Sequence, residues 1–218
     1  MGLIMINTIK KYNFISFVIV FIGLPILLLS LSDLQPRSIL KNTISIVPLL
    51  AFSLILGQFF LSRTNNLTKN IYKFKNVINI HKIIGYFVVV VFFTHPFLIV
   101  LPRYFESGPE PIDALIKMIT TFESTGVILG LIAWVSMLLL GITSMFRHKL
   151  NISYKAWRVF HGLLALLFIV VATWHAVDLG RNTNVSISIF LILAASAGSM
   201  LLIKQYIFSN KKEEIKNV

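Results

Sequence analysis

The chain has 218 residues, of which 56% are hydrophobic and 13% are charged, and it contains no cysteine. A water-soluble domain of this length could not bury so much apolar surface, so the composition favours a membrane protein. Without cysteine, thiolate-held iron-sulfur clusters and disulfides are excluded, and any metal would need histidine or carboxylate ligands. The formal net charge of +12 raises the question of a nucleic-acid partner, which the placement of the charges answers.

Six apolar segments recur along the chain, and each can cross a hydrocarbon core of roughly 30 Å as a helix. They are residues 14–31, 44–61, 78–101, 127–146, 157–177 and 185–207. The first follows Lys10 and Lys11 like a signal peptide, but it is too long and no small-residue cleavage site follows it. We therefore predict an all-α membrane protein, a six-transmembrane-helix bundle that forms a single domain over residues 1–218 without a flavin or nicotinamide domain.

Basic residues gather in alternate connections between these segments. Fifteen of the twenty lysine and arginine residues lie in the N-terminus, in the connections after the second and fourth segments, in the C-terminal tail, or in the segment ends next to these parts. Because positive charge collects on the cytoplasmic side of membrane proteins, both termini are predicted to be cytoplasmic. The expected location is the plasma membrane, specifically a bacterial inner membrane. The net charge thus reports orientation, so membrane lipid is an expected partner and nucleic acid is not.

The connection between the third and fourth segments carries two further signals. Its apolar residues have helical spacing and predict a short helix on the outer surface: Ile112, Leu115, Ile116, Ile119 and Phe122. Its acids Glu106, Glu110 and Asp113 would raise the local concentration of cationic ferric species within about 10 Å.

Four of the five histidines lie in the third and fifth apolar segments. His81 and His95 are fourteen residues apart, and so are His161 and His175. At 100° per residue, fourteen residues return to within about 40° of the starting face and rise roughly 21 Å. Each pair therefore shares one face of its helix, with one member near each membrane surface.

The third and fifth segments run in the same direction, because one span separates them. His81 can then face His161 near the cytoplasmic side, while His95 faces His175 near the outer side. A porphyrin iron takes axial imidazoles from its two faces, so we predict two b-type haems, each with bis-histidine iron. Zinc fits poorly, because a tetrahedral site needs ligands that converge on one point.

Cationic side chains near these histidines are candidates to bind the haem propionates. Arg158 lies one turn before His161, and Lys82 is also on the predicted cytoplasmic side, although both residues also serve as determinants of topology. Arg103 and Arg181 are the corresponding outer candidates. Between the histidines, small residues such as Gly85 would leave room for a macrocycle, but small residues are also common at helix contacts in membranes.

The stretches "HKIIGYFVVVVFFTH" and "SYKAWRVFHGLLALLFIVVATWH" resemble the ferric reductase-like transmembrane domain family. This family includes NADPH oxidases, cell-surface ferric reductases and the haem-binding membrane subunit of a periplasmic methionine sulfoxide reductase. The resemblance runs from about Ile44 to Ile207. It implies six helices with haem between the third and fifth, and it maps the ligands onto the same four histidines. Cytochrome b of quinol-oxidising complexes has similar histidine pairs, but on its second and fourth helices.

The resemblance and the histidine pairs together predict the membrane component of an oxidoreductase. Electrons would pass from a cytoplasmic flavoprotein or from quinol to an external acceptor, namely ferric iron, dioxygen or a periplasmic partner enzyme. The sequence is compatible with a bound flavin but carries no fingerprint for one.

Two other classes of function compete with this prediction. A haem-free transporter or proton channel would use the four histidines to line a hydrated path, although no acid lies between the members of either pair. A purely structural subunit of a larger complex would leave the matched histidine pairs unexplained.

Overall fold

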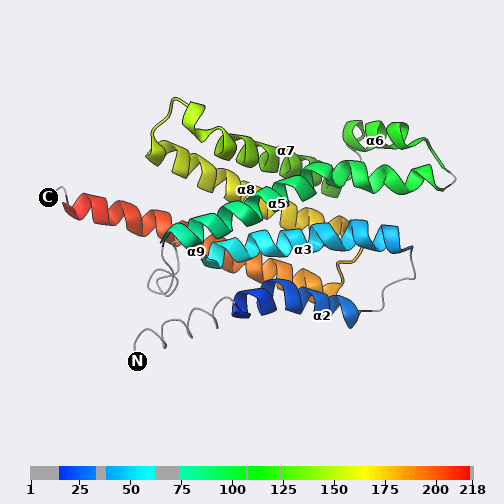
Figure 1. Ribbon diagram of the computed structural model, residues 1–218, viewed down its shortest axis with the longest axis horizontal. Helices are drawn as coiled ribbons and strands as arrows, with labels where there is room; N and C mark the ends of the chain where they lie inside the picture. The colour runs from blue at the N-terminus through cyan, green and yellow to red at the C-terminus, as the bar shows by residue number, and fades with distance from the viewer. Residues whose placement is uncertain (1–14, 33–37, 62–73, 107, 123, 217–218) are drawn as a thin grey trace.

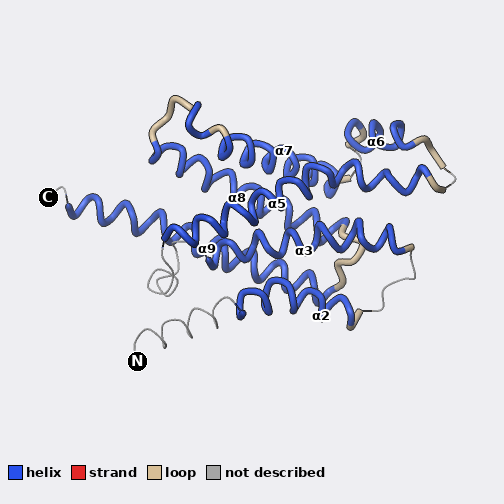
Figure 2. Tube along the Cα trace, viewed as in Figure 1, coloured by secondary structure: helices blue, strands red, loops and turns tan. Residues whose placement is uncertain are grey.

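The structure is a computed structural model that describes residues 15–32, 38–61, 74–106, 108–122 and 124–216. Figure 1 shows long helices lying side by side in a bundle. Figure 2 shows these helices joined by loops, and the described part of the chain contains no strand. The predicted all-α class is confirmed. Several residues behind the topology prediction, Lys10, Lys11, Arg63, Lys69 and Lys73, lie outside the described residues.

Five described helices are long and apolar enough to cross a membrane, as judged by length and composition. They belong to α3 (Ile39–Leu61), α5 (Phe74–Val100), α7 (Thr125–Met145), α8 (Tyr154–Leu179) and α9 (Val185–Lys216). The first apolar segment is a shorter helix, Ile15–Ser30, which includes the π-helical turn η1 (Ile19–Gly23) and α2 (Leu24–Ser30). The number of six spans and the cytoplasmic location of the termini therefore remain predictions.

Successive long helices alternate in direction, so α5 and α8 run the same way, as predicted (Figure 1). The α7–α8 turn lies at one end of the bundle, where the C-terminal part of α9 also projects. The short helix α6 (Pro111–Thr120) lies at the opposite end, beside the end of α5. We call these the α7–α8 end and the α6 end. The helix predicted from the apolar spacing of this connection is thus confirmed.

A proline and a serine attach the first helix to α3. Pro25 has no backbone N–H, so the carbonyl of Phe21 lacks its usual intrahelical donor. The buried hydroxyl of Ser53 in α3 donates to that carbonyl at 2.7 Å. Such a bond typically contributes about 1 kcal/mol, and it fixes the position of α2 on α3.

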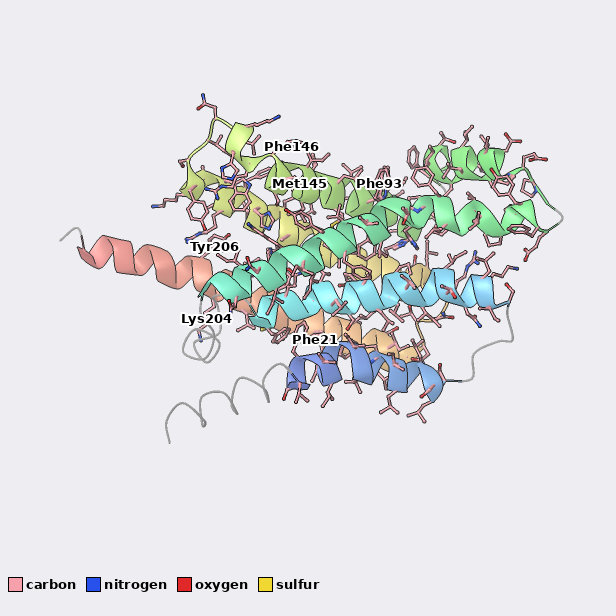
Figure 3. All side chains as sticks on the ribbon, viewed as in Figure 1. Phe21, Phe93, Met145, Phe146, Lys204 and Tyr206 are labelled. Atoms are coloured by element: carbon pink, nitrogen blue, oxygen red, sulfur yellow. The ribbon has the colours of Figure 1, made fainter. Side chains whose placement is uncertain are left out.

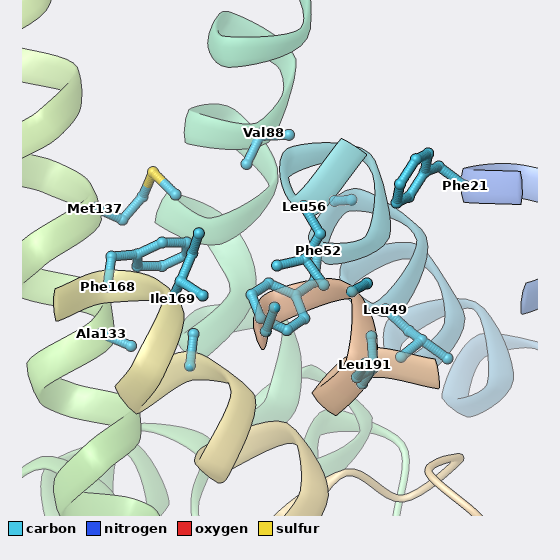
Figure 4. Close-up of a cluster of buried hydrophobic side chains, with 14 of the residues drawn as sticks. Phe21, Leu49, Phe52, Leu56, Val88, Ala133, Met137, Phe168, Ile169 and Leu191 are labelled. Atoms are coloured by element: carbon cyan, nitrogen blue, oxygen red, sulfur yellow. The ribbon is translucent and has the colours of Figure 1, made fainter. Parts of the chain in front are cut away.

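Figure 4 shows apolar side chains from several helices meeting in one core. Leu56, Val88, Ile169 and Leu191 are fully buried there and come from α3, α5, α8 and α9. Large apolar side chains also cover the outside of the bundle, including Leu163 and Phe93, which is labelled in Figure 3. An extended exposed apolar surface is what a lipid-facing protein requires.

The antiparallel pair α7 and α8 makes the most extensive helix contact in the described chain. Small buried residues allow the two backbones to approach closely, among them Gly126 and Ala133 of α7 and Ala172 of α8. The hydroxyl of Ser153 caps the start of α8 by accepting from the N–H of Ala156 at 3.2 Å. This pair positions the histidines of α8.

Candidate functional site

His81 of α5 and His161 of α8 face one another toward the α7–α8 end of the bundle. Their ring centres are 6.4 Å apart, and the ring planes make an angle of 68°. An imidazole nitrogen binds a transition metal such as zinc at about 2.0–2.1 Å, so two rings on opposite sides of one metal ion would have centres roughly 6 Å apart. The observed spacing suits two imidazoles that bind one iron from opposite sides. The angle of 68° between the ring planes is compatible with this, because each ring can rotate about the line that joins the two rings.

Ser144 of α7 determines which nitrogen of His161 is free. The Ser144 hydroxyl donates to the carbonyl of Leu140 at 2.6 Å, and it lies 3.3 Å from Nδ1 of His161. Because the hydroxyl proton is already used, the hydroxyl oxygen can only accept from Nδ1–H. The lone pair of His161 is then on Nε2, the nitrogen available to a metal.

The first turn of α7 orients His175 in the same way. Nδ1 of His175 lies 2.8 Å from the carbonyl oxygen of Gly126, which can only accept a hydrogen bond. Nδ1 therefore carries the proton and Nε2 carries the lone pair. Gly130 provides the space for this ring, because a Cβ at that position would lie 2.6 Å from the ring atoms Cε1 and Nδ1.

His95 is the counterpart of His175 on α5, and the two are close enough to interact electrostatically. Nδ1 of His95 is buried and has no hydrogen-bond partner among the described residues. The ring of Phe92 packs against His95 at 6.5 Å, nearly perpendicular at 85°. α5 continues through Pro96 to Val100, so the proline does not end the helix after His95.

Protein atoms separate the two histidine pairs. The rings of Phe92 and Phe168 meet at 6.0 Å between α5 and α8, and Val88 beside them is fully buried. Side chains therefore fill the middle of the stretch between the histidines, where small residues were expected to leave room for a macrocycle. Next to His81, however, Gly85 adjoins open space, since a Cβ placed there would have no atom of another helix within 4 Å. The arrangement therefore keeps the two histidine pairs apart and leaves open space beside Gly85, one turn from His81.

Aromatic and cationic side chains surround His161 at the α7–α8 end. Trp157 lies 5.1 Å from His161, and Tyr154 stacks on Trp157 at 6.0 Å. The guanidinium of Arg147 lies 4.4 Å from the ring centre of Tyr154 and 5.0 Å from that of Trp157. These contacts extend from His161 to the exposed connection between α7 and α8.

Two buried donors at this end have no partner within the described part of the chain: Nε of Arg158 and Nε1 of Trp157. A buried donor without an acceptor costs about 1–3 kcal/mol, so an anionic ligand group at this position would be favourable. A propionate of a haem would supply such acceptors. Arg158 thus has an unpartnered donor for the role predicted for it, whereas Lys82 is exposed, and both roles stay predictions.

α9 supports α8 at the same end. The hydroxyl of Tyr206 donates to the carbonyl of Arg158 at 2.6 Å. Burial raises the pKa of this hydroxyl above its ordinary value, so it stays protonated at neutral pH. Figure 3 shows Tyr206 near the point where α9 leaves the bundle.

No group of three or more histidine or carboxylate side chains converges within the described ranges. The arrangement therefore offers pairs of nitrogen ligands rather than a closed tetrahedral site. Two ligands per site are what an iron already held by four porphyrin nitrogens requires. On spacing, free nitrogens and unpartnered donors, the residues present fit haem.

The contributions of Gly126, Gly130 and Ser144 were not predicted from the sequence. One signal was available, because Gly130 and Ser144 are fourteen residues apart, as are His161 and His175. When two helices run antiparallel, two residues fourteen apart on one helix can each lie beside one of two residues fourteen apart on the other. The relative register of the two helices is needed to recognise this.

Comparison with known protein families agrees with a helical membrane protein. The family described as "Ferric reductase like transmembrane component" matches residues 47–172, which is more than half of the chain. The chain therefore belongs to this ferric reductase-like transmembrane family. The matched region includes His81, His95 and His161, and His175 lies three residues beyond it.

An uncharacterised protein of Archaeoglobus fulgidus is 36% identical over 165 residues, which cover 76% of this chain and 90% of that protein. No solved structure matches the chain. Membership of the family indicates a multi-pass membrane protein that takes part in transmembrane electron transfer, and domains of this family generally bind haem.

Proposed function

We propose that this protein carries electrons across the membrane through two b-type haems, one held by His81 and His161 and one held by His95 and His175. The observation that best supports the proposal is the 6.4 Å separation of the His81 and His161 rings. The orientation of His161 and His175 by α7 also supports the proposal. In both rings Nδ1 faces a partner on α7, which leaves an unprotonated Nε2 available to iron.

Bound haem would supply reversible one-electron chemistry at iron. The chain would supply two imidazoles for each iron, and Ser144 and the Gly126 carbonyl would keep the imidazoles of α8 in the required tautomer. Arg158 and Trp157 would donate to the propionates of the haem at the α7–α8 end. Phe92 and Phe168 would exclude water between the two sites.

The orientation follows from the charge distribution. The α7–α8 end carries Arg147, Lys149 and Lys155, which supports a cytoplasmic location for this end under the positive-inside rule. The haem of His81 and His161 would then be the inner one, reduced by a cytoplasmic flavoprotein or by quinol. The outer haem of His95 and His175 would serve an external acceptor. In this arrangement the chain is a single six-span domain of the plasma membrane, and a bacterial inner membrane is the proposed location.

The proposal is tested first by counting haem. The protein purified in detergent should show a b-type spectrum in the dithionite-reduced minus oxidised difference, and a pyridine haemochrome assay should give two haems per chain. Absence of haem would support the histidine-lined channel instead. One haem would show that one histidine pair is not used for haem.

Single alanine variants then assign the ligands. Loss of either His81 or His161 should remove the inner haem, and loss of either His95 or His175 should remove the outer one. His148, which is exposed in the connection between α7 and α8, provides the matched control, and H148A should keep both haems. Two intact haems in H95A and H175A would contradict the assignment.

A further inference from the structure

A cleft of about 340 Å³ opens at the α6 end of the bundle. Residues from several elements line it, including α3 through Lys41, the 3-10 turn η2 (Leu101–Tyr104) through Arg103, and the connection after α8 through Arg181. Ile99 and Met118 contribute apolar walls. Binding sites for small molecules usually enclose about 300–1,000 Å³, so this cleft has the size for a small ligand.

The charges that line the cleft are unequal. Lys41 and Glu106 form an ion pair at 2.6 Å, so the only carboxylate among the described lining residues already has a cationic partner. Arg103 and Arg181 have no carboxylate partner in the described chain. Among the described residues, the cleft therefore carries two guanidinium groups that no carboxylate pairs with. Glu106, one of the acids expected to raise the local concentration of cationic ferric species, is thus paired with Lys41.

The position of Arg103 is supported by its surroundings. Gly108 has a φ of +150°, and Nη1 of Arg103 lies 2.8 Å from the place that a Cβ at Gly108 would occupy. A side chain at position 108 would thus displace the guanidinium. Planar guanidinium groups bind carboxylates through two parallel hydrogen bonds, and two of them can hold an anion with more than one carboxylate.

The cleft lies just beyond the second histidine pair. Ile99 follows His95 by one helical turn on α5, and Arg181 follows His175 by six residues after α8. A ligand in the cleft would therefore be near the proposed outer haem, on the side predicted to be external. The apolar walls would contact the carbon skeleton of the ligand, while the arginines bind its charged ends.

We propose that this cleft binds a small anion with two or more carboxylate groups from the external medium. Anion binding at this cleft does not depend on the proposed function. Carboxylates could reach Arg103 and Arg181 from a second source, the propionates of an outer haem, and the experiment separates the two sources.

Citrate is the probe. It is titrated by calorimetry into the purified, haem-containing protein in a neutral detergent at low ionic strength. Free anion binding predicts saturable uptake by the wild type and at least about tenfold weaker binding by R103Q/R181Q, because two charge-assisted contacts are lost. K117Q, which removes an exposed lysine of α6 that does not line the cleft, should bind citrate like the wild type.

Misfolding of R103Q/R181Q would also abolish binding, so a second variant that is expected to bind citrate more tightly is included. E106Q removes the only negative charge among the described lining residues and releases Lys41. It should bind citrate roughly threefold to tenfold more tightly, as expected for one nearby charge in a partly hydrated site. Equal or weaker binding by E106Q would contradict the proposal.

Failure of the wild type to bind citrate would overturn the inference, including the case in which propionates already occupy both arginines. Citrate binding of equal strength in R103Q/R181Q would overturn it too. The haem count decides the proposed function separately. Citrate binding by a protein without haem would support the anion site and count against the proposed function.

Discussion

The two helices that carry the histidines are supported in different ways. On α8, both Nδ1 atoms have partners on α7, the carbonyl of Gly126 for His175 and the hydroxyl of Ser144 for His161. On α5, Nδ1 of His95 is buried without a partner in the described chain, and His81 is exposed. The protein alone thus fixes one side of each site, whereas a bound ligand would have to fix the other.

This difference indicates where each kind of mutation should act. Changes on α7 should disturb imidazoles that are already in place. Changes on α5 should leave the polypeptide unaffected and interfere with the ligand between the helices.

Replacing Gly130 by leucine should have the largest effect, because the new side chain would occupy the position of the His175 ring. Under the proposed function the protein would lose the outer haem and keep the inner one, so the pyridine haemochrome assay should fall from two haems to one. Overpacking of α7 against α8 should also cost about 1–3 kcal/mol of stability. G23A is the control, since its Cβ would meet no atom closer than the carbonyl of Val18 at 3.9 Å. Two unperturbed haems in G130L would refute the supporting role of α7.

Replacing Gly85 by leucine tests the open side. No atom of another helix lies within 4 Å of a Cβ at this position, so the polypeptide can accommodate the side chain. A haem beside His81 could not, and G85L should lose the inner haem while its thermal unfolding without haem is unchanged. V90L, at an exposed position of the same helix, should retain both haems. A normal inner haem in G85L would show that this space is not used by the cofactor.

Replacing Ser144 by alanine should have a smaller effect, because His161 would keep its place but lose the acceptor for Nδ1–H. A poorer imidazole donor stabilises ferric iron less, so the midpoint potential of the inner haem should rise by about 20–60 mV, the equivalent of one hydrogen bond. Redox titration followed optically would measure this. T143V is the control, because the Thr143 hydroxyl bonds only within α7. An equal shift in T143V would exclude a specific role for Ser144.

Replacing Tyr206 by phenylalanine should have the smallest effect. The variant loses the hydrogen bond to the Arg158 carbonyl and should be less stable by about 0.5–1.5 kcal/mol, without loss of haem. Because burial raises the pKa of Tyr206, the folded protein holds this proton more tightly than the unfolded chain. Its contribution to stability is present below pH of about 10 and is lost as the pH rises through the raised pKa. Thermal unfolding of Y206F and of Y86F, an exposed control, would show this.

The sequence predicted the elements better than their contacts. Apolar length located the five long helices and the first, shorter one, and apolar spacing located α6. The fourteen-residue spacing of the histidines predicted that α5 and α8 present them on one face each, and the structure places His81 opposite His161 and His95 near His175. These inferences need only the geometry of a single helix and the order of the spans.

Contacts between helices could not be predicted in the same way. The bond from Ser53 to Phe21, the orientation of His175 by Gly126 and the pairing of Lys41 with Glu106 each depend on how far one segment is displaced along another. Apolar patterns do not encode that displacement in a membrane, where most faces are apolar. The cleft at Arg103 and Arg181 was missed for this reason, although both arginines had been recognised individually.

The antiparallel contact of α7 and α8 also limits how this chain can change in length. Deleting one residue between Gly130 and Ser144 would turn one of them by about 100° relative to the other, and only one could then adjoin its histidine. A compensating deletion between His161 and His175 would restore that contact but would move these histidines out of step with His81 and His95. The segments from Gly130 to Ser144, from His161 to His175 and from His81 to His95 therefore have to keep the same length as one another. Insertions and deletions that preserve both sites are expected in the connections, such as the one between α7 and α8.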